Sequence, residues 1–193
     1  MVLKSMCSLM CRTPNLKKLV FLISGNISKI GLETAMRSWR GLESITISSM
    51  LHRIDFFEAI GKYCTNIVSL KITYCFELFE AEALVRYTPN LKVLSIRNMT
   101  IAMRGLCHAL NNLEHLEVVN LCHSDILDTD NWNQVYSIDD VLSRVNISCK
   151  LITTCQISTC NRCKNQCTRN PIRLPCEPSE DIWREDEIRS LSR

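Results

Sequence analysis

Several features that would assign a function directly are missing from this sequence of 193 residues. No apolar run approaches the roughly 18–20 residues that cross a membrane, so we expect no membrane contact. Residues 1–10 lack a sustained apolar core because Lys4 and Ser5 interrupt it, and secretion is therefore not expected. The net charge is only +3, and no long basic stripe indicates nucleic-acid binding.

The sequence signatures of common enzyme classes are also missing. There is no P-loop, no Rossmann glycine fingerprint and no G-x-S-x-G sequence. Cys107 and His108 are adjacent, so they cannot face each other as a nucleophile and a base from separate segments. His52, His115 and His123 stand alone. We therefore expect a protein that is not an enzyme.

Cysteine, by contrast, is abundant, with 12 residues. Without a secretory segment, this number is typical of free thiols in a reducing compartment rather than of a disulfide framework. The expected location is the cytoplasm or the nucleus.

Internal repetition is the strongest positive signal. Residues 13–17, Thr-Pro-Asn-Leu-Lys, recur as residues 88–92. The pattern apolar-x-x-apolar-x-apolar occurs five times, each time preceded by Asn or Gly, at Leu16/Leu19/Phe21, Leu42/Ile45/Ile47, Ile67/Leu70/Ile72, Leu91/Leu94/Ile96 and Leu113/Leu116/Val118. The starts are spaced by 26, 25, 24 and 22 residues, which is typical of leucine-rich repeats.

This spacing predicts a strand followed by a helix in each repeat. The last two apolar positions of each match lie on one face of a short strand, because side chains alternate along a strand. Phe56, Ile60 and Tyr63 then follow at helical spacing. One such unit cannot bury its own apolar face, whereas stacked units can. The prediction is an α/β leucine-rich-repeat solenoid of about five irregular repeats of 22–26 residues. Pro14 and Pro89 disfavour the alternative of continuous helices.

The chain divides into four predicted parts. Residues 1–12 are interpreted as the remnant of a preceding repeat helix, and residues 13–127 as the repeats. Residues 128–148 are predicted to contain a connecting helix with Ser137 as its N-cap. Residues 149–193 are predicted to form a less ordered, Cys-rich tail that is basic at first and then acidic.

The repeats resemble those of plant F-box/leucine-rich-repeat proteins. The resemblance rests on the Thr-Pro-Asn-Leu-Lys sequence at the strand start, on the Cys-type turn that ends at Cys75, and on residues 39–45 in the same register. It covers about residues 10–127, together with two short patches at residues 160–164 and 182–191. It implies the substrate-recognition part of an SCF-type (Skp–cullin–F-box) ubiquitin ligase, in which the repeats hold a protein substrate.

In that family an F-box upstream of the repeats binds the Skp adaptor. Only about 12 residues precede the first repeat here, too few for an F-box. The expectation is a truncated chain that binds the adaptor and cullin only in a full-length form. Two alternatives remain open: a leucine-rich-repeat scaffold unrelated to ubiquitin, and a zinc-dependent tail that binds nucleic acid.

The predicted partner-binding surface is the concave strand face. Positions that alternate with the apolar ones face away from the core, and such faces are the usual binding surfaces of solenoids. A plain solvated face is the alternative for any single residue. The selected positions are Lys18, Val20, Thr46, Ser48, Lys71, Thr73, Ser95, Arg97, His115 and Glu117.

A possible zinc site lies in the tail. Thiolates at C-x-x-C spacing can reach one tetrahedral Zn²⁺, and the candidate ligands are Cys155, Cys160, Cys163 and Cys167. Only one C-x-x-C pair is present, whereas two would be a strong signal. Unligated thiols are therefore favoured, and no cofactor is expected. The basic residues between Lys150 and Cys176 have no aromatic platform among them, so nucleic-acid binding is only weakly indicated.

Overall fold

The computed structural model describes residues 13, 15–21, 28–47, 53–97, 99–122, 124–128, 134–146 and 149–154. Within these residues the chain alternates strands and helices. The strands are Lys18–Phe21 (β1), Ser44–Ile47 (β2), Ser69–Ile72 (β3), Val93–Ile96 (β4), Thr100–Ala102 (β5), Val118–Asn120 (β6), Asp125–Leu127 (β7), Val135–Tyr136 (β8) and Leu151–Thr153 (β9). The helices are Lys29–Ser38 (α2), Arg53–Tyr63 (α3), Leu78–Tyr87 (α4), Met103–Asn112 (α5) and Ile138–Leu142 (α6).

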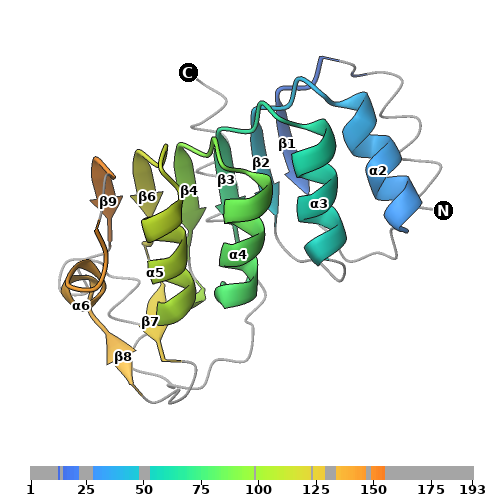
Figure 1. The fold of residues 1–193 in the computed structure, drawn as a ribbon. Coiled ribbons are helices and arrows are strands. Elements are labelled where there is room, and N and C mark those ends of the chain that lie inside the picture. The colour runs from blue at the N-terminus through green and yellow to red at the C-terminus, as the bar shows by residue number, and fades with distance from the viewer. Residues whose placement is uncertain are drawn as a thin grey trace.

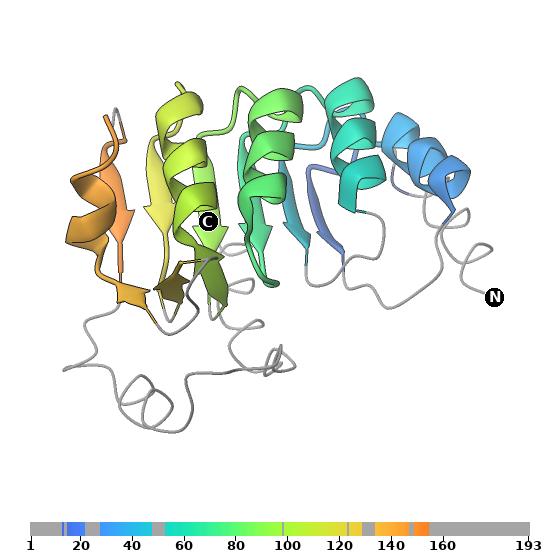
Figure 2. The same cartoon turned by 60° about the horizontal axis from the view of Figure 1, so that its bottom comes forward.

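A parallel sheet of six strands, in the order β1-β2-β3-β4-β6-β9, organises the molecule. Helices α2 to α5 lie side by side on one face of this sheet (Figures 1 and 2). The register aligns five apolar residues across the centre of the sheet, and we call them the central row. They are Leu19, Ile45, Leu70, Leu94 and Val119. All five are buried. The predicted α/β class is confirmed, with a parallel sheet covered by helices.

The Thr-Pro-Asn-Leu-Lys sequence ends a helix and starts a strand. The Thr88 N–H and the Thr88 hydroxyl both donate to the Leu84 carbonyl, each at 2.8 Å, and close the last turn of α4. Pro89 cannot continue the helix. The Leu91 N–H then donates to the Thr88 carbonyl at 3.1 Å, and Leu91 is fully buried. The same turn joins Leu16 to Thr13, at 3.3 Å.

The fifth unit has a different register from the predicted one. β4 pairs with β6 so that Val93 lies opposite Val118 and Leu94 opposite Val119. The Leu116 N–H donates to the Leu113 carbonyl, so Leu116, not Leu113, occupies the position of Leu91. The predicted set was therefore wrong by three residues.

Correcting the register makes the units more regular. Leu116, Val119 and Leu121 are the apolar set, and the spacing from Leu91 to Leu116 is 25 residues. Val119, which follows Val118 and would face away from the core in the predicted register, is fully buried. The error arose because Asn112 precedes a leucine and imitates the Asn-Leu pair that starts other strands.

The sheet also extends beyond residue 127, the predicted end of the repeats. β9 pairs in parallel with β6, with Val119 opposite Ile152. Along the chain, β7, β8 and α6 lie between β6 and β9, and β7 and β8 join β5 in a small sheet of order β5-β7-β8. α6 begins after Ser137, whose Oγ accepts from the Asp140 N–H at 3.2 Å, so the predicted N-cap is confirmed.

Some predictions concern residues outside the described ranges. These are the remnant helix at residues 1–12 and the tail beyond residue 154. Across the part of the chain that the structure describes, no helix has the length and apolar character needed to span a membrane.

Candidate protein-interaction surface

The open face of the sheet is the side that points away from helices α2 to α5. Strand side chains alternate, so this face carries the neighbours of the buried central row. The register aligns them in two rows across the strands. They are Lys18, Ser44, Ser69, Val93, Val118 and Leu151 in the first row, and Val20, Thr46, Lys71, Ser95 and Asn120 in the second.

Most side chains of the open face are small or polar. Lys18 is exposed, Val20 is 38% exposed, and Lys71 and Ser95 are half-buried. Thr46 differs, because only 3% of it is exposed. A face of this kind lets a partner approach the sheet closely and offers hydroxyl, amide and ammonium groups for hydrogen bonds.

The strand ends hold two of the other predicted residues. Thr73 follows β3 and is buried, and its hydroxyl donates to the Ile47 carbonyl at 3.2 Å. This bond gives Thr73 a structural role in joining neighbouring units. Arg97 follows β4 and is half-buried. Ser48 lies outside the described residues.

The last two predicted residues lie off the open face. Because β6 begins at Val118, His115 lies in the preceding turn, and Glu117 immediately precedes the strand. Their predicted strand-face placement was wrong, and the three-residue register error is the cause. Asn120 takes the open-face position in this strand, and its Oδ1 accepts from the Cys122 N–H at 3.1 Å.

Glu117 belongs instead to a charged row along the leading edge of the sheet. We define this edge as the residues immediately before the six strands: Lys17, Glu43, Val68, Lys92, Glu117 and Lys150. The N–H of each residue after Lys17 donates to the carbonyl of the one before it. The charges alternate in sign on both sides of Val68. The sequence carries this signal, but it becomes visible only when the strands are aligned.

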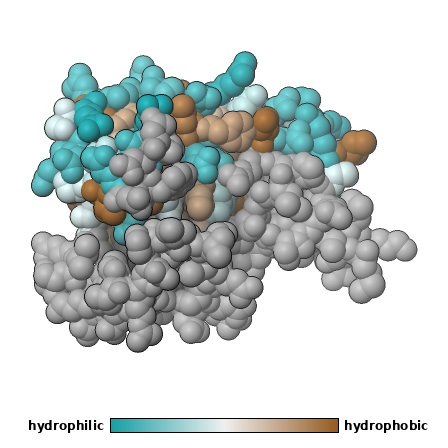
Figure 3. Space-filling model, turned by 90° about the horizontal axis from the view of Figure 1, so that it is seen from below, coloured by the Kyte–Doolittle hydropathy of each residue, from teal (hydrophilic) through white to brown (hydrophobic). Residues whose placement is uncertain are grey.

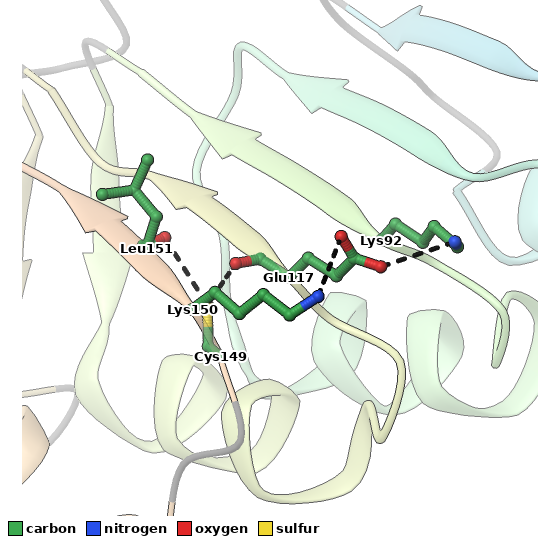
Figure 4. A network of polar contacts seen from close by, with 5 residues as sticks. All are labelled: Lys92, Glu117, Cys149, Lys150 and Leu151. Atoms are coloured by element: carbon green, nitrogen blue, oxygen red, sulfur yellow. Dashed lines mark hydrogen bonds and ion pairs between the residues drawn. The ribbon is translucent and has the colours of Figure 1, made fainter.

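Two groups of ion pairs follow from the alternation. Lys17 Nζ lies 2.6 Å from Glu43 Oε1. Glu117 lies between two lysines, with Lys92 Nζ at 3.4 Å from Oε1 and Lys150 Nζ at 3.5 Å from Oε2 (Figure 4). These pairs are exposed, so each contributes little to stability. Their position joins neighbouring strands at the same point in successive units.

The two lysines hold the pKa of Glu117 below its ordinary value of 4.5, the largest single cause being the charge of Lys150 and the next being the hydrogen bond from Lys92. Folding therefore favours the ionised carboxylate. The resulting stabilisation is present above the unfolded pKa and is lost as pH falls through the lower folded pKa.

We expect Glu117→Gln to flatten the acid limb of the stability profile. Between about pH 5 and pH 3 the variant should lose less stability than the parent chain, because it has no such carboxylate to protonate. Urea unfolding at a series of pH values measures this loss. Lys92→Gln combined with Lys150→Gln should flatten the profile in the same way. An unchanged slope in both variants would show that these pairs do not affect folding.

Metal and thiol chemistry have no visible centre in the described part of the chain. No three residues among its His, Cys, Asp and Glu are grouped closely enough to hold a metal ion. Cys155, Cys160, Cys163 and Cys167, the predicted zinc ligands, lie outside it. Cys64 is buried against the Met36 carbonyl, and desolvation raises the pKa of its thiol to about 11. It therefore stays protonated and packs as an apolar side chain.

Comparison with known proteins finds plant relatives. No protein-family model matches the sequence. An F-box/LRR-repeat protein of Arabidopsis thaliana is 32% identical over 186 residues, which is 93% of this chain. The chain is therefore similar to plant F-box/leucine-rich-repeat proteins. A putative F-box protein of the same plant is 27% identical over 184 residues, again 93% of the chain.

The family match extends beyond the repeats found in the sequence. Because it covers 93% of the chain, it includes more than the predicted repeat region at residues 13–127. The chain spans 60% of the first relative and 53% of the second.

Proposed function

We propose that this chain is the substrate-recognition part of an SCF-type ubiquitin ligase. In this proposal its strand–helix units form a leucine-rich-repeat solenoid, and the open face holds a protein substrate. The observation that carries the proposal is an aligned row of mostly small or polar side chains across five paired strands, in a chain similar to F-box/leucine-rich-repeat proteins. The chain contributes binding rather than chemistry.

The geometry of the open face supports protein binding. Adjacent strands lie about 4.8 Å apart, so six strands span roughly 24 Å, enough for a folded segment of a partner. Helices α2 to α5 occupy the other side of the sheet. Lys71, opposite Ser95, and Lys18, on β1, supply positive charge on this face, so a substrate with acidic side chains fits best.

The other proteins of the proposed ligase are inferred from the similarity to F-box/leucine-rich-repeat proteins. The Skp adaptor and cullin would join through an F-box in a full-length form, and the assembly would act in the cytoplasm or nucleus. The chain would then set which protein is ubiquitinated and degraded.

Open-face substitutions should separate substrate binding from adaptor binding. In a full-length form that carries an F-box, expressed in plant cells, the doubly substituted Lys71→Glu/Ser95→Arg form should still co-purify the adaptor and cullin. Capture of proteins that accumulate when the proteasome is inhibited should fall at least tenfold, which corresponds to about 1.4 kcal/mol. Quantitative mass spectrometry of the purified complexes gives both values.

Arg86→Glu, on exposed Arg86 in the helix layer, is the matched control and should leave substrate capture unchanged. Equal loss in both variants would contradict binding by the open face. Substrate capture without adaptor or cullin would favour an interaction scaffold unrelated to ubiquitin.

A further inference from the structure

Three consecutive helices expose apolar side chains in their first turns. Ile30 is the second residue of α2 and is 79% exposed, and Ile54 is the second residue of α3 and 52% exposed. Leu78 and Phe79 begin α4 and are 37% and 38% exposed. We name these four residues the apolar row. In α5 the second residue is the exposed Arg104, so the row ends there.

The helices that carry the apolar row are neighbours in space. α2 packs against α3, and α3 packs against α4. Packed helices have axes about 8–10 Å apart, so the row extends over roughly 20 Å. Figure 3 looks toward this end of the helices, and brown and tan side chains form an interrupted line there between teal ones. Single exposed apolar residues are ordinary, but a repeated row marks an interaction surface.

An acidic row runs beside the apolar row, one helical turn further along each helix. Its members are Glu33, Glu58 and Glu82. Each lies nine residues before the apolar residue of the turn that leads into the next strand, which is Leu42, Ile67 or Leu91. Glu58 and Asp55 share Lys29, whose Nζ lies 3.0 Å from an oxygen of each. Near the apolar row, two carboxylates, those of Asp55 and Glu58, therefore share the one ammonium group of Lys29.

A basic row follows one more turn along, at Arg37, Lys62 and Arg86, and it is engaged by tyrosines. Arg37 Nη2 donates to the Tyr63 hydroxyl at 2.9 Å. The Arg37 guanidinium and the Lys62 ammonium both lie over the Tyr63 ring, at 5.1 and 5.2 Å from its centroid. Arg86 lies 5.7 Å from the centroid of Tyr87.

Helix stability accounts for the two charged rows but not for the apolar one. Glutamate four residues before lysine or arginine stabilises a helix, and basic side chains suit its C-terminal end. Isoleucine and phenylalanine exposed in a first turn contribute neither effect. The stabilising effects that explain the two charged rows therefore do not explain the apolar row.

We propose that the apolar row is a docking site for an amphipathic helix of a partner protein, with basic residues along one side of its apolar stripe. A helix rises 1.5 Å per residue, so apolar residues seven apart lie about 10 Å apart and match the spacing of α2, α3 and α4. Basic side chains beside the stripe then face the acidic row. This surface lies on the helix layer, apart from the open face, so its occupancy is independent of the proposed function.

A pair of synthetic helical peptides tests the proposal on the 193-residue chain. Both have about three heptads with leucine at the apolar positions. One carries lysine along one flank, and the other carries glutamate there. We expect the lysine peptide to bind, more weakly as salt increases. The glutamate peptide should bind at least tenfold less tightly. Fluorescence anisotropy measures both.

Substitutions in the chain locate the site. Ile54→Ser/Phe79→Ser should weaken lysine-peptide binding at least tenfold, while circular dichroism shows a folded chain, because both side chains are exposed. Val135→Ser/Leu151→Ser removes two other exposed apolar residues and should leave binding unchanged. Lys71→Glu, on the open face, should also leave it unchanged.

Four outcomes would overturn the proposal. The first is no binding of the lysine peptide, and the second is equal binding of the two peptides. The third is binding that Ile54→Ser/Phe79→Ser does not weaken. The fourth is evidence for a different occupant. This would be binding of the chain to vesicles of anionic lipid, or self-association in sedimentation, that Ile54→Ser/Phe79→Ser abolishes.

Discussion

Replacing Leu94 with alanine is expected to lower the free energy of unfolding by about 2–5 kcal/mol, the usual cost of a buried leucine. Leu94 is fully buried at the centre of β4, opposite Leu70 and Val119 on the neighbouring strands. Its loss would open a cavity between the sheet and the helices. Denaturant unfolding, followed by far-ultraviolet circular dichroism, measures the change.

Ser95→Ala is the matched control, one residue further along the same strand. Ser95 is on the open face, so its substitution should change stability by no more than about 0.5 kcal/mol. Thr46 is in the same row of the open face, but it is only 3% exposed and is not a suitable control. Similar losses for Leu94→Ala and Ser95→Ala would mean that the strand register is incorrect.

Gly105→Ala should also destabilise the chain, by about 1–3 kcal/mol, because the added methyl group overpacks the site. A Cβ at Gly105 would lie 2.6 Å from the Glu77 carbonyl oxygen and 2.7 Å from its carbon. These are backbone atoms at the start of α4, where the Glu77 N–H donates to Glu80 Oε2 at 3.0 Å. Relief of the clash would shift α5 away from α4 or disturb this cap.

Alanine favours a helix over glycine by about 1 kcal/mol, so helix propensity alone predicts the opposite sign. Gly41→Ala is the control, since its nearest neighbour would be the flexible Lys17 Nζ at 3.8 Å. Its stability should be unchanged or slightly raised. Thermal unfolding of the two variants compares them, and a Gly105→Ala chain as stable as Gly41→Ala would exclude close packing of α5 on α4.

The first four strands of the sheet could be predicted from the sequence. Each has two large apolar residues at a spacing of two, as in Leu70 and Ile72, and a preceding apolar residue that fills the turn. This pattern results directly from burial of one strand face. The later strands could not be predicted in the same way. Cys149 and Thr154 replace the expected leucines around β9, and Asn112 imitates a strand start before β6.

The open face, the leading edge and the apolar row were harder to predict from the sequence, because each depends on how neighbouring strand–helix units align in space. Glu43 and Lys17, or Glu117 and Lys92, become partners only once the register places one beside the other. Burial of Thr46 follows from tertiary packing that no local pattern specifies. The apolar row requires both the helix starts and their exposed fractions.

Contact between the open face and a substrate is the most direct test of the proposed function. A photo-crosslinking amino acid at Ser95, in a full-length form with an F-box, should capture a protein that carries ubiquitin chains when the proteasome is inhibited. The same amino acid at exposed Arg40, in the turn after α2, should not. Capture of that ubiquitinated protein from Arg40 and not from Ser95 would contradict substrate binding by the open face.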